Sequence, residues 1–195
     1  MHIILLVVVV FLLMLGLWVG SDPLLQEKVV PEKLIKIYWE RKVDRERLKN
    51  ELLRDEGGIK LQAYKPVATE KHFTIGVGHY GADVTQGMKI TKEKALELFE
   101  KDIDTALQDV KALIGTNHPP QVLEGFANMA FQLGRTKLRK FTETIKLIKA
   151  KKYDAASIEM LDSDWADQTK ERAKRVANKF KVKNIKEKFR KASNG

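Results

Sequence analysis

The sequence predicts an α+β protein: a small mixed lobe, a long connecting helix and an all-helical second lobe, preceded by a membrane-spanning segment. Three observations predict it. Residues 3–20 carry no charged or polar side chain, two short alternating apolar runs lie between residues 59 and 77, and apolar residues recur at helical spacing from Thr91 onward. The 195-residue length suits one domain plus an appendage.

The N-terminal segment has the length and polarity of a membrane anchor. Ile3 to Gly20 is eighteen uncharged residues, close to the roughly 20 that a spanning helix needs. No Lys or Arg precedes it, and no small-residue cleavage site follows it. We therefore expect an uncleaved transmembrane or signal-anchor helix over residues 1–20, with a cleaved signal or a buried core helix as alternatives.

A linker with an amphipathic helix follows over residues 21–43, and Pro31 suits the first position of that helix. The main domain is expected over residues 44–181. Asp44 is a candidate cap for its first helix, which runs to about Asp55 and is stopped by Gly57-Gly58.

The alternating runs, Ile59–Tyr64 and Phe73–Val77, predict two half-buried strands that form a small hairpin. A further short strand is expected near Met88–Ile90. After Thr91 a helix of about 23 residues is predicted, long enough to connect two lobes. Further helices are expected from Pro119-Pro120 to Gly134 and over residues 141–150, 154–161 and 169–180.

Composition narrows the chemistry. The chain has no cysteine, which excludes disulfides, thiolate metal sites and thiol nucleophiles, and we expect no metal and no cofactor.

The C-terminal end is strongly basic, because the residues from Lys170 onward include eleven Lys or Arg and only two acids. This basic end, with its tail at residues 182–195, suits an anionic lipid or cell-wall polymer, although a lysine-rich solvated helix is the simpler interpretation.

Glu56 is a candidate general acid, although by itself it is one of 26 acids, most of which are expected to be surface charges. It ends a charged helix next to a glycine pair and faces a hairpin that contains Thr74 within TIGVGHYG. A carboxyl group opposite a hydroxyl can deliver a proton on one side and hold a water on the other. The glycines do not form a nucleotide-binding signature, because their spacing is wrong and no helix follows at once.

Several separated motifs resemble the phage-type lysozymes of glycoside hydrolase family 24. They are DEG, a strand ending in Ala-Tyr, TIGVGH, NMAFQLG at residues 128–134, Phe141-Thr142 and SDWADQTKERAKRV at residues 163–176. The match covers about residues 46–180, roughly 70% of the chain, and implies a lysozyme-like fold.

By position, the resemblance implies that Glu56 protonates the glycosidic oxygen and that Thr74 helps to hold the attacking water. It also implies that Arg172 pairs with Glu56, and that His79 and Asp102 form a structural ion pair. The remaining matched positions lie near or line the cleft, and they are Tyr64, Gln132, Trp165, Gln168 and Thr169. We expect Trp165 to pack in the core or the cleft floor rather than to stack on a sugar.

One loop departs from the family pattern. Many members have an aspartate shortly after the tyrosine that corresponds to Tyr64, but the only acid here before Thr74 is Glu70. The loop is about two residues longer, and a subgroup of phage lysozymes has a similar segment. Glu70 is therefore a candidate second catalytic carboxylate, and an exposed glutamate at the hairpin tip is the alternative.

The resemblance implies a monomeric muramidase that cuts peptidoglycan between N-acetylmuramic acid and N-acetylglucosamine during cell-wall lysis. Because the apolar segment is rich in Val, Leu and Ile, we expect a firm anchor in the host inner membrane or a virion membrane, with the catalytic domain facing the periplasm and wall. A releasable anchor is the alternative. Nucleic acid is not an expected specific partner. The alternatives are a lysozyme-fold protein that acts on membranes through its basic tail, and a lytic transglycosylase.

Overall fold

The computed structural model describes residues 43–182. The predicted anchor, the helix expected from Pro31 and the tail from residue 183 lie outside the described residues. Within residues 43–182, no helix combines the length and apolar character needed to cross a membrane. The elements in chain order are α3 (Arg45–Asp55), β1 (Lys60–Tyr64), β2 (Phe73–Gly76), β3 (His79–Gly81), α4 (Lys92–Ile114), α5 (Pro120–Leu138), α6 (Thr142–Lys149), α7 (Tyr153–Leu161), α8 (Asp164–Gln168) and α9 (Lys170–Phe180).

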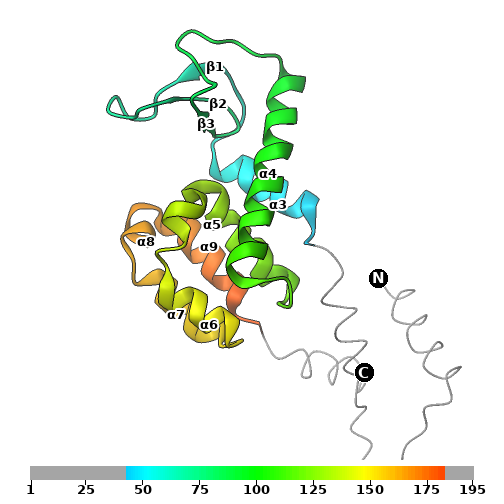
Figure 1. Cartoon of the computed structure of the whole chain (residues 1–195), viewed down its shortest axis with the longest axis vertical. Helices are drawn as coiled ribbons and strands as arrows, with labels where there is room; N and C mark the ends of the chain where they lie inside the picture. Colours follow the sequence, from blue (N-terminus) through cyan, green and yellow to red (C-terminus); the bar gives the residue numbers. More distant parts are fainter. Residues whose placement is uncertain (1–42, 183–195) are drawn as a thin grey trace, which may run out of the picture. The chain divides into compact units, whose positions relative to one another are not determined.

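The strands form one antiparallel sheet in the order β1-β2-β3, set apart from most of the helices (Figure 1). The two predicted strands are confirmed as β1 and β2. The sequence did not predict the third strand, His79–Gly81. The turn at Val77-Gly78 reverses the chain directly after β2, so these residues pair with β2 first. The expected strand near residue 89 is only an isolated bridge between Gln62 and Lys89.

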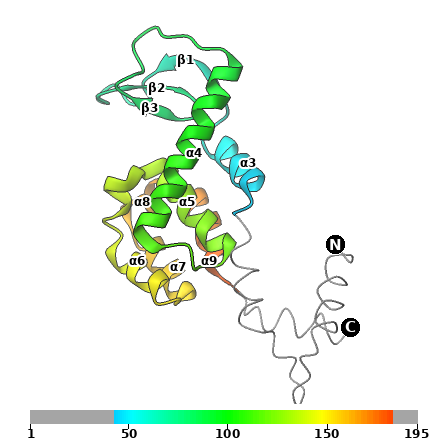
Figure 2. The same cartoon turned by 45° about the vertical axis from the view of Figure 1, so that its right-hand side comes forward.

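Helix α4 has 23 residues, as predicted, and runs from the sheet into the helical lobe (Figures 1 and 2). The Thr91 hydroxyl caps its start by accepting from the Lys94 amide at 3.2 Å. Glu97 lies between Lys94 and Lys101 and forms an ion pair with each on the solvent side. The helix ends at Gly115, whose φ of 80° favours glycine. The helix therefore joins the two lobes as one continuous element.

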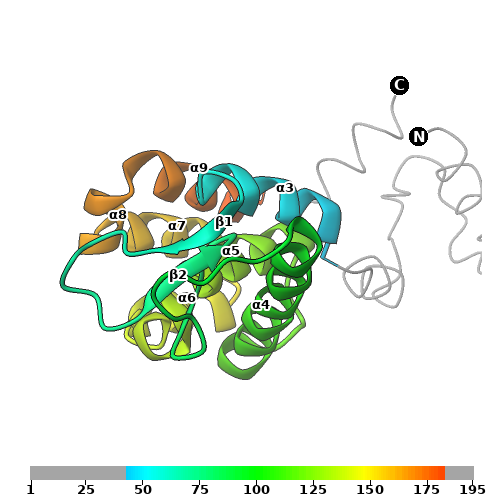
Figure 3. The same ribbon diagram turned by 90° about the horizontal axis from the view of Figure 1, so that it is seen from above.

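The helical lobe is built around α5. Seen from above, α3 and α9 lie side by side over it (Figure 3). The helices predicted within the described residues are present, and the short α8 has no predicted counterpart. The first helical run of α5 ends at Gly134, as predicted, because this glycine has a non-helical φ of 67°, and a second short run continues α5 to Leu138. The largest fully buried side chains come mainly from α3, α4, α5 and α9, and include Leu48, Leu52, Phe99, Ile103, Phe126, Met129 and Phe180. This shared core fixes the ends of α3 and α9 that carry the candidate site.

A buried glutamate holds the first turn of α3. Glu124 of α5 is fully buried, and its Oε1 accepts from the backbone N–H of Asp44 at 3.0 Å. Arg47 Nε donates to Glu124 Oε2 at 2.9 Å, and Lys179 Nζ of α9 lies 3.2 Å from the same oxygen. A buried carboxylate is tolerated when cations and an amide satisfy it in this way. Three helices therefore meet at one carboxylate.

Candidate active site

Two adjacent carboxylates at the end of α3 have different surroundings. Asp55 is the last helical residue and its side chain is 2% exposed, whereas the side chain of Glu56 is 20% exposed. The Glu56 amide still donates to the Leu52 carbonyl at 2.8 Å, and Gly57, with a φ of 73°, ends the helix as predicted. Glu56 is thus the carboxylate of the pair with substantially more access to solvent.

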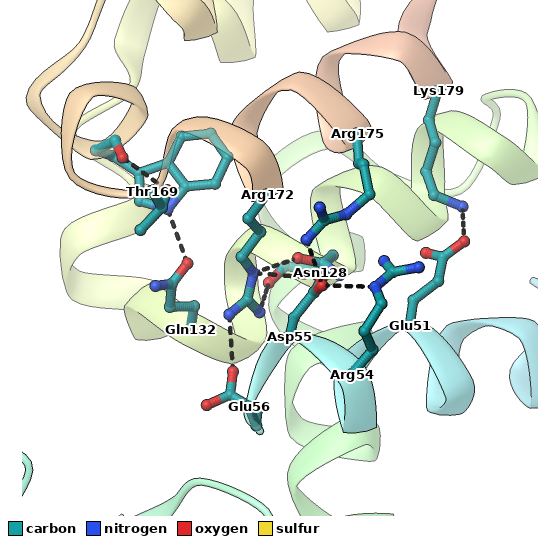
Figure 4. A network of polar contacts seen from close by, with 11 residues as sticks. Glu51, Arg54, Asp55, Glu56, Asn128, Gln132, Thr169, Arg172, Arg175 and Lys179 are labelled. Atoms are coloured by element: carbon teal, nitrogen blue, oxygen red, sulfur yellow. Dashed lines mark hydrogen bonds and ion pairs between the residues drawn. The ribbon is translucent and has the colours of Figure 1, made fainter. Parts of the chain in front are cut away.

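Arg172 of α9 links Glu56 to the helical lobe. Its Nη1 donates to Glu56 Oε1 at 2.8 Å, so the pair implied by the family resemblance is present. The other arms of the guanidinium bind Asn128 of α5: Nε donates to the side-chain oxygen at 2.7 Å and Nη2 to the carbonyl at 3.2 Å. Figure 4 shows Arg172 directed between Glu56 and Asn128. The planar guanidinium group of Arg172 is therefore held in place by Glu56 on one side and Asn128 on the other.

Asp55 completes this network. It accepts from Asn128 Nδ2 at 3.1 Å and from Arg175 Nη2 at 2.7 Å, and Arg172 Nε lies 3.7 Å away. Burial acts to raise the pKa of the Asp55 carboxyl, but the Asn128 hydrogen bond, Arg175 and Arg172 together hold that pKa below its ordinary value. Asp55 therefore stays ionised and orients Asn128, which in turn binds Arg172.

The turn between β2 and β3 approaches Glu56 closely. A Cβ placed on Gly78 would lie 2.8 Å from Glu56 Oε2, and Gly78 has a φ of 73°. The backbone conformation favours glycine there, and an added Cβ would displace the carboxyl group of Glu56. The contact sets the turn directly against the carboxyl group of Glu56.

Thr74 lies in the middle strand and is 5% exposed. Its Cα is paired with Tyr64 in β1 and Tyr80 in β3. Burial raises the pKa of the Tyr64 phenol, and the negative charges of Glu56 and Glu70 raise it further. Glu56 and Glu70 thus both lie close enough to Tyr64, the residue that pairs with Thr74, to raise its pKa.

Glu70 is half-buried in the loop between β1 and β2. Its Oε2 is buried and has no hydrogen-bond partner within residues 43–182. The loop is fastened locally, because Lys65 Nζ donates to the Glu70 carbonyl at 2.6 Å and the Glu70 amide donates to Val67. Nearly all buried polar atoms in folded proteins have a partner, so this oxygen is unusual.

The residues expected near the cleft on the helical side divide into buried and exposed groups. Trp165 is 6% exposed, contacts the edge of Phe141, and donates from Nε1 to Gln132 Oε1 at 2.9 Å. The Thr169 hydroxyl donates to the Trp165 carbonyl at 2.7 Å. Gln132 and Gln168 are exposed. Trp165 is thus a core residue that positions Gln132.

His79 forms the expected pair with Asp102, with 2.8 Å between Nδ1 and Oδ2, and a second contact with Asp83 at 3.0 Å. The hydrogen bond to Asp102 raises the pKa of His79 to about 9, assisted by Asp83 and opposed by burial. Both ring nitrogens of His79 bind carboxylates, and the bond to Asp102 connects the sheet to α4.

Among the described residues no group of three or more His, Cys, Asp or Glu is arranged to hold a metal ion.

The sequence of the chain matches a family model described as phage lysozyme over residues 54–182. It is 32% identical over 164 residues to the probable T4-type lysozyme 2 of Dictyostelium discoideum, covering 70% of this chain and 95% of that protein. It is also 32% identical over 83 residues to the endolysin of Bacillus phage PZA, covering 43% and 32% respectively. A third relative, the peptidoglycan hydrolase gp36 of Pseudomonas phage phiKMV, is 33% identical over 117 residues, which are 55% of this chain and 13% of that protein.

The chain therefore belongs to the phage lysozyme family. It is accordingly a glycoside hydrolase of the lysozyme type.

Sequence reasoning missed three residues of the polar network, Asp55, Asn128 and Arg175, and also Gly78, whose turn approaches Glu56. Two of them stand in motifs that were already recognised, since Asn128 opens NMAFQLG and Arg175 lies in ERAKRV. The signal for Asp55 was its position beside Glu56. Nothing local distinguishes Gly78 from the neighbouring glycines, because its role depends on a contact with another element.

Proposed function

We propose that the chain is a muramidase that hydrolyses the β-1,4 bond between N-acetylmuramic acid and N-acetylglucosamine in peptidoglycan, with Glu56 as the general acid. One observation carries the assignment: Glu56 keeps access to solvent while the buried Arg172 holds one of its oxygens at 2.8 Å. The other oxygen faces the Gly78 turn. The carboxyl group is thus fixed in direction and open to substrate.

In the proposed reaction, the Glu56 carboxyl protonates the glycosidic oxygen, and the bond from that oxygen to the anomeric carbon breaks. A water attacks the anomeric carbon from the opposite face and gives up its proton to a base. Glu56 is left as a carboxylate beside Arg172. In inverting enzymes the two carboxyl groups stand about 6.5–9.5 Å apart to leave room for this water.

Glu70 with Thr74 is our candidate for holding the water. The support is twofold. The Oε2 atom of Glu70 is buried and has no hydrogen-bond partner in the described residues, and Thr74 pairs with Tyr64, whose pKa is raised by both Glu56 and Glu70. A carboxylate oxygen with a free lone pair can accept the proton of an attacking water. Thr74 would orient that water through its hydroxyl.

The remaining predicted residues are assigned supporting roles. The exposed Gln132 and Gln168, with Thr169, are proposed to form the substrate-contacting side of the helical lobe, and the buried Trp165 is proposed to support Gln132 from behind. Tyr64, Arg172 and the pair of His79 and Asp102 are proposed to keep the site in shape. No cofactor takes part in this scheme.

For the whole chain we propose a monomeric, membrane-anchored enzyme of bacterial cell-wall lysis. The support is the apolar run of residues 3–20 and the basic composition of residues 182–195. The catalytic domain, residues 44–181, would face the periplasm and wall from the host inner membrane or a virion membrane. Carbonate extraction over time tests the anchor: a releasable one yields full-length soluble protein, whereas a firm one stays with the membrane.

Mass spectrometry of digested peptidoglycan tests the reaction. The wild-type chain should release fragments with N-acetylmuramic acid at a new reducing end, gained with water. Glu56→Gln should release almost none, and Glu159→Gln, at an exposed acid without an ion pair in the described region, should match the wild type. Normal digestion by Glu56→Gln would refute the assignment.

The same digests separate the alternatives. Anhydro-sugar ends identify a lytic transglycosylase, and lysis without any new glycan end indicates action on the membrane through the basic tail. Proton NMR of the first product should detect the α-anomer if the reaction inverts. Glu70→Gln should lower turnover at least tenfold, and unchanged turnover would leave Thr74 alone as the group that holds water.

A further inference from the structure

The positive charge of the described body is concentrated in one run, residues 135–152. This run contains eight Lys or Arg and a single acid, for a net charge of +7, while the other residues between 43 and 182 together carry −2. The basic tail lies outside this count. The charge of the described domain is thus unevenly distributed, even when the basic tail is left out.

Most cations of this run lack an ion-pair partner. Only Arg135, with Asp109 at 2.6 Å, and Lys146, with Glu143 at 3.3 Å, form ion pairs within the described part of the chain. The other six are exposed and form no ion pair with any residue in that part; they are Lys137, Arg139, Lys140, Lys149, Lys151 and Lys152. Elsewhere exposed charges are often balanced, as by Glu97 between two lysines. We call these six residues the α6 basic surface.

The fold gathers the six residues around one short helix. They lie at the end of α5, in the turn after it, on α6 and in the turn before α7. An eight-residue helix is about 12 Å long, so the surface extends over on the order of 20 Å. Lys151 has a φ of 58°, the one positive φ of a non-glycine residue in the described chain. A lysine thus stands where glycine or asparagine is sterically easier.

This surface leaves the candidate active site free. Helix α6 lies at the end of the helical lobe away from the sheet in two views (Figures 1 and 2). Glu56 lies at the end of α3, against the turn between β2 and β3. A ligand held on α6 therefore does not cover the candidate acid.

The composition of the surface favours a water-soluble polyanion over a membrane. The most exposed residues of α6 are charged or polar, and its buried residues, Thr144 and Ile148, face the core. The exposed Ile158 of α7 has Asp154, Glu159 and Asp162 nearby in sequence, which would repel anionic headgroups. A membrane-surface helix instead combines its cations with an apolar face.

We propose that the α6 basic surface binds a linear polyphosphodiester of the bacterial cell wall, and so holds the enzyme on the wall while the separate site cuts glycan. Closely spaced lysines and an arginine suit a chain of phosphates, because each contact releases a bound counterion. The proposal goes beyond the hydrolytic function, and binding is measured without turnover, so either can fail alone.

The test is equilibrium binding of purified poly(glycerol phosphate) to the full chain in a neutral detergent. The triple variant Lys140→Gln, Lys149→Gln and Lys151→Gln should weaken binding about tenfold near 0.1 M salt and flatten the salt dependence. The matched control, Lys60→Gln, Lys89→Gln and Lys92→Gln, removes three exposed sheet-side charges and should bind as the wild type does. The corresponding change of Lys140, Lys149 and Lys151 to Arg should preserve binding.

Equal weakening by both glutamine triples would overturn the proposal, since it would show that net charge or the tail accounts for binding. Stronger binding of double-stranded DNA than of the polymer by the same surface would overturn it as well. A third result would also overturn the proposal: the glutamine triple variant of the α6 basic surface loses binding to phosphatidylglycerol vesicles but binds the polymer as the wild type does. Unchanged thermal unfolding of both triples confirms that each comparison is between folded proteins.

Discussion

Arg172 donates a 2.8 Å hydrogen bond to Glu56 across a separation of 116 residues in the sequence. The bond joins the end of the first described helix to the last one. Since Arg172 is only 7% exposed and also binds Asn128, the guanidinium has little freedom to follow the glutamate. The direction of the Glu56 carboxyl group is thus set by the helical lobe.

Replacing Arg172 with Gln should reduce both activity and stability. The change removes the cation shared by Glu56 and the buried Asp55, so we expect at least a tenfold loss of kcat and about 3 kcal/mol less unfolding free energy. Arg172→Lys should be intermediate, because an ammonium group keeps the charge without the planar fork. Turnover measurements with urea unfolding check this, and full activity of Arg172→Gln would contradict it.

Asn128→Leu should destabilise the protein by about 3 kcal/mol. The side chain donates to Asp55 and accepts from Arg172, and its loss leaves two buried charged groups each without one partner. Asn178→Leu, at an exposed position of α9, is the control and should change stability by less than about 0.5 kcal/mol. Equal stability of the two variants in thermal unfolding would contradict the proposed role.

Gly78→Ala should impair catalysis more than its effect on stability implies. The new methyl group would meet Glu56 Oε2, whereas Gly87 has a similar φ of 77° with nothing within 4 Å of an added Cβ. Both alanine variants should lose about 1 kcal/mol of stability from the left-handed backbone. Only Gly78→Ala should lower kcat, by tenfold or more, and a similar kcat for both would exclude the contact as a cause.

His79 should make stability depend on pH in the alkaline range. Its pKa is raised to about 9 in the folded state, from about 6.5 when unfolded, so its contribution is complete below pH 6.5 and is lost as pH rises through 9. The full contribution is about 3 kcal/mol. Urea unfolding of the wild type and His79→Gln should therefore converge above about pH 9, and Asp102→Asn should remove most of the difference.

The elements predicted from the sequence were those with local signals. Asp44 and Thr91 cap helices, and the apolar spacing after Thr91 gives the 23 residues of α4. Strand β3 was not predicted because its pairing depends on where the turn at Gly78 directs the chain, and the apolar pattern near Met88 gave no information on that.

The candidate acid and one of its partners could be proposed from the sequence, but most of the polar network around them could not. Glu56 and Thr74 stand in a recognisable segment, and the family resemblance supplied Arg172. Asp55 and Asn128 become partners only when α3, α5 and α9 pack together, so their pairing is a property of the core. The buried Glu124 is a similar case, since in the sequence it is one acid among 26.

The position of Glu124 has a mechanical consequence. It binds the amide of Asp44 and the side chain of Arg47 at the first turn of α3, while Glu56 lies at the opposite end of that helix. Tension applied to the polypeptide before residue 43 reaches these contacts first, and α5 and α9 bear it with them. The contacts that bear such tension therefore lie at the end of α3 opposite to Glu56.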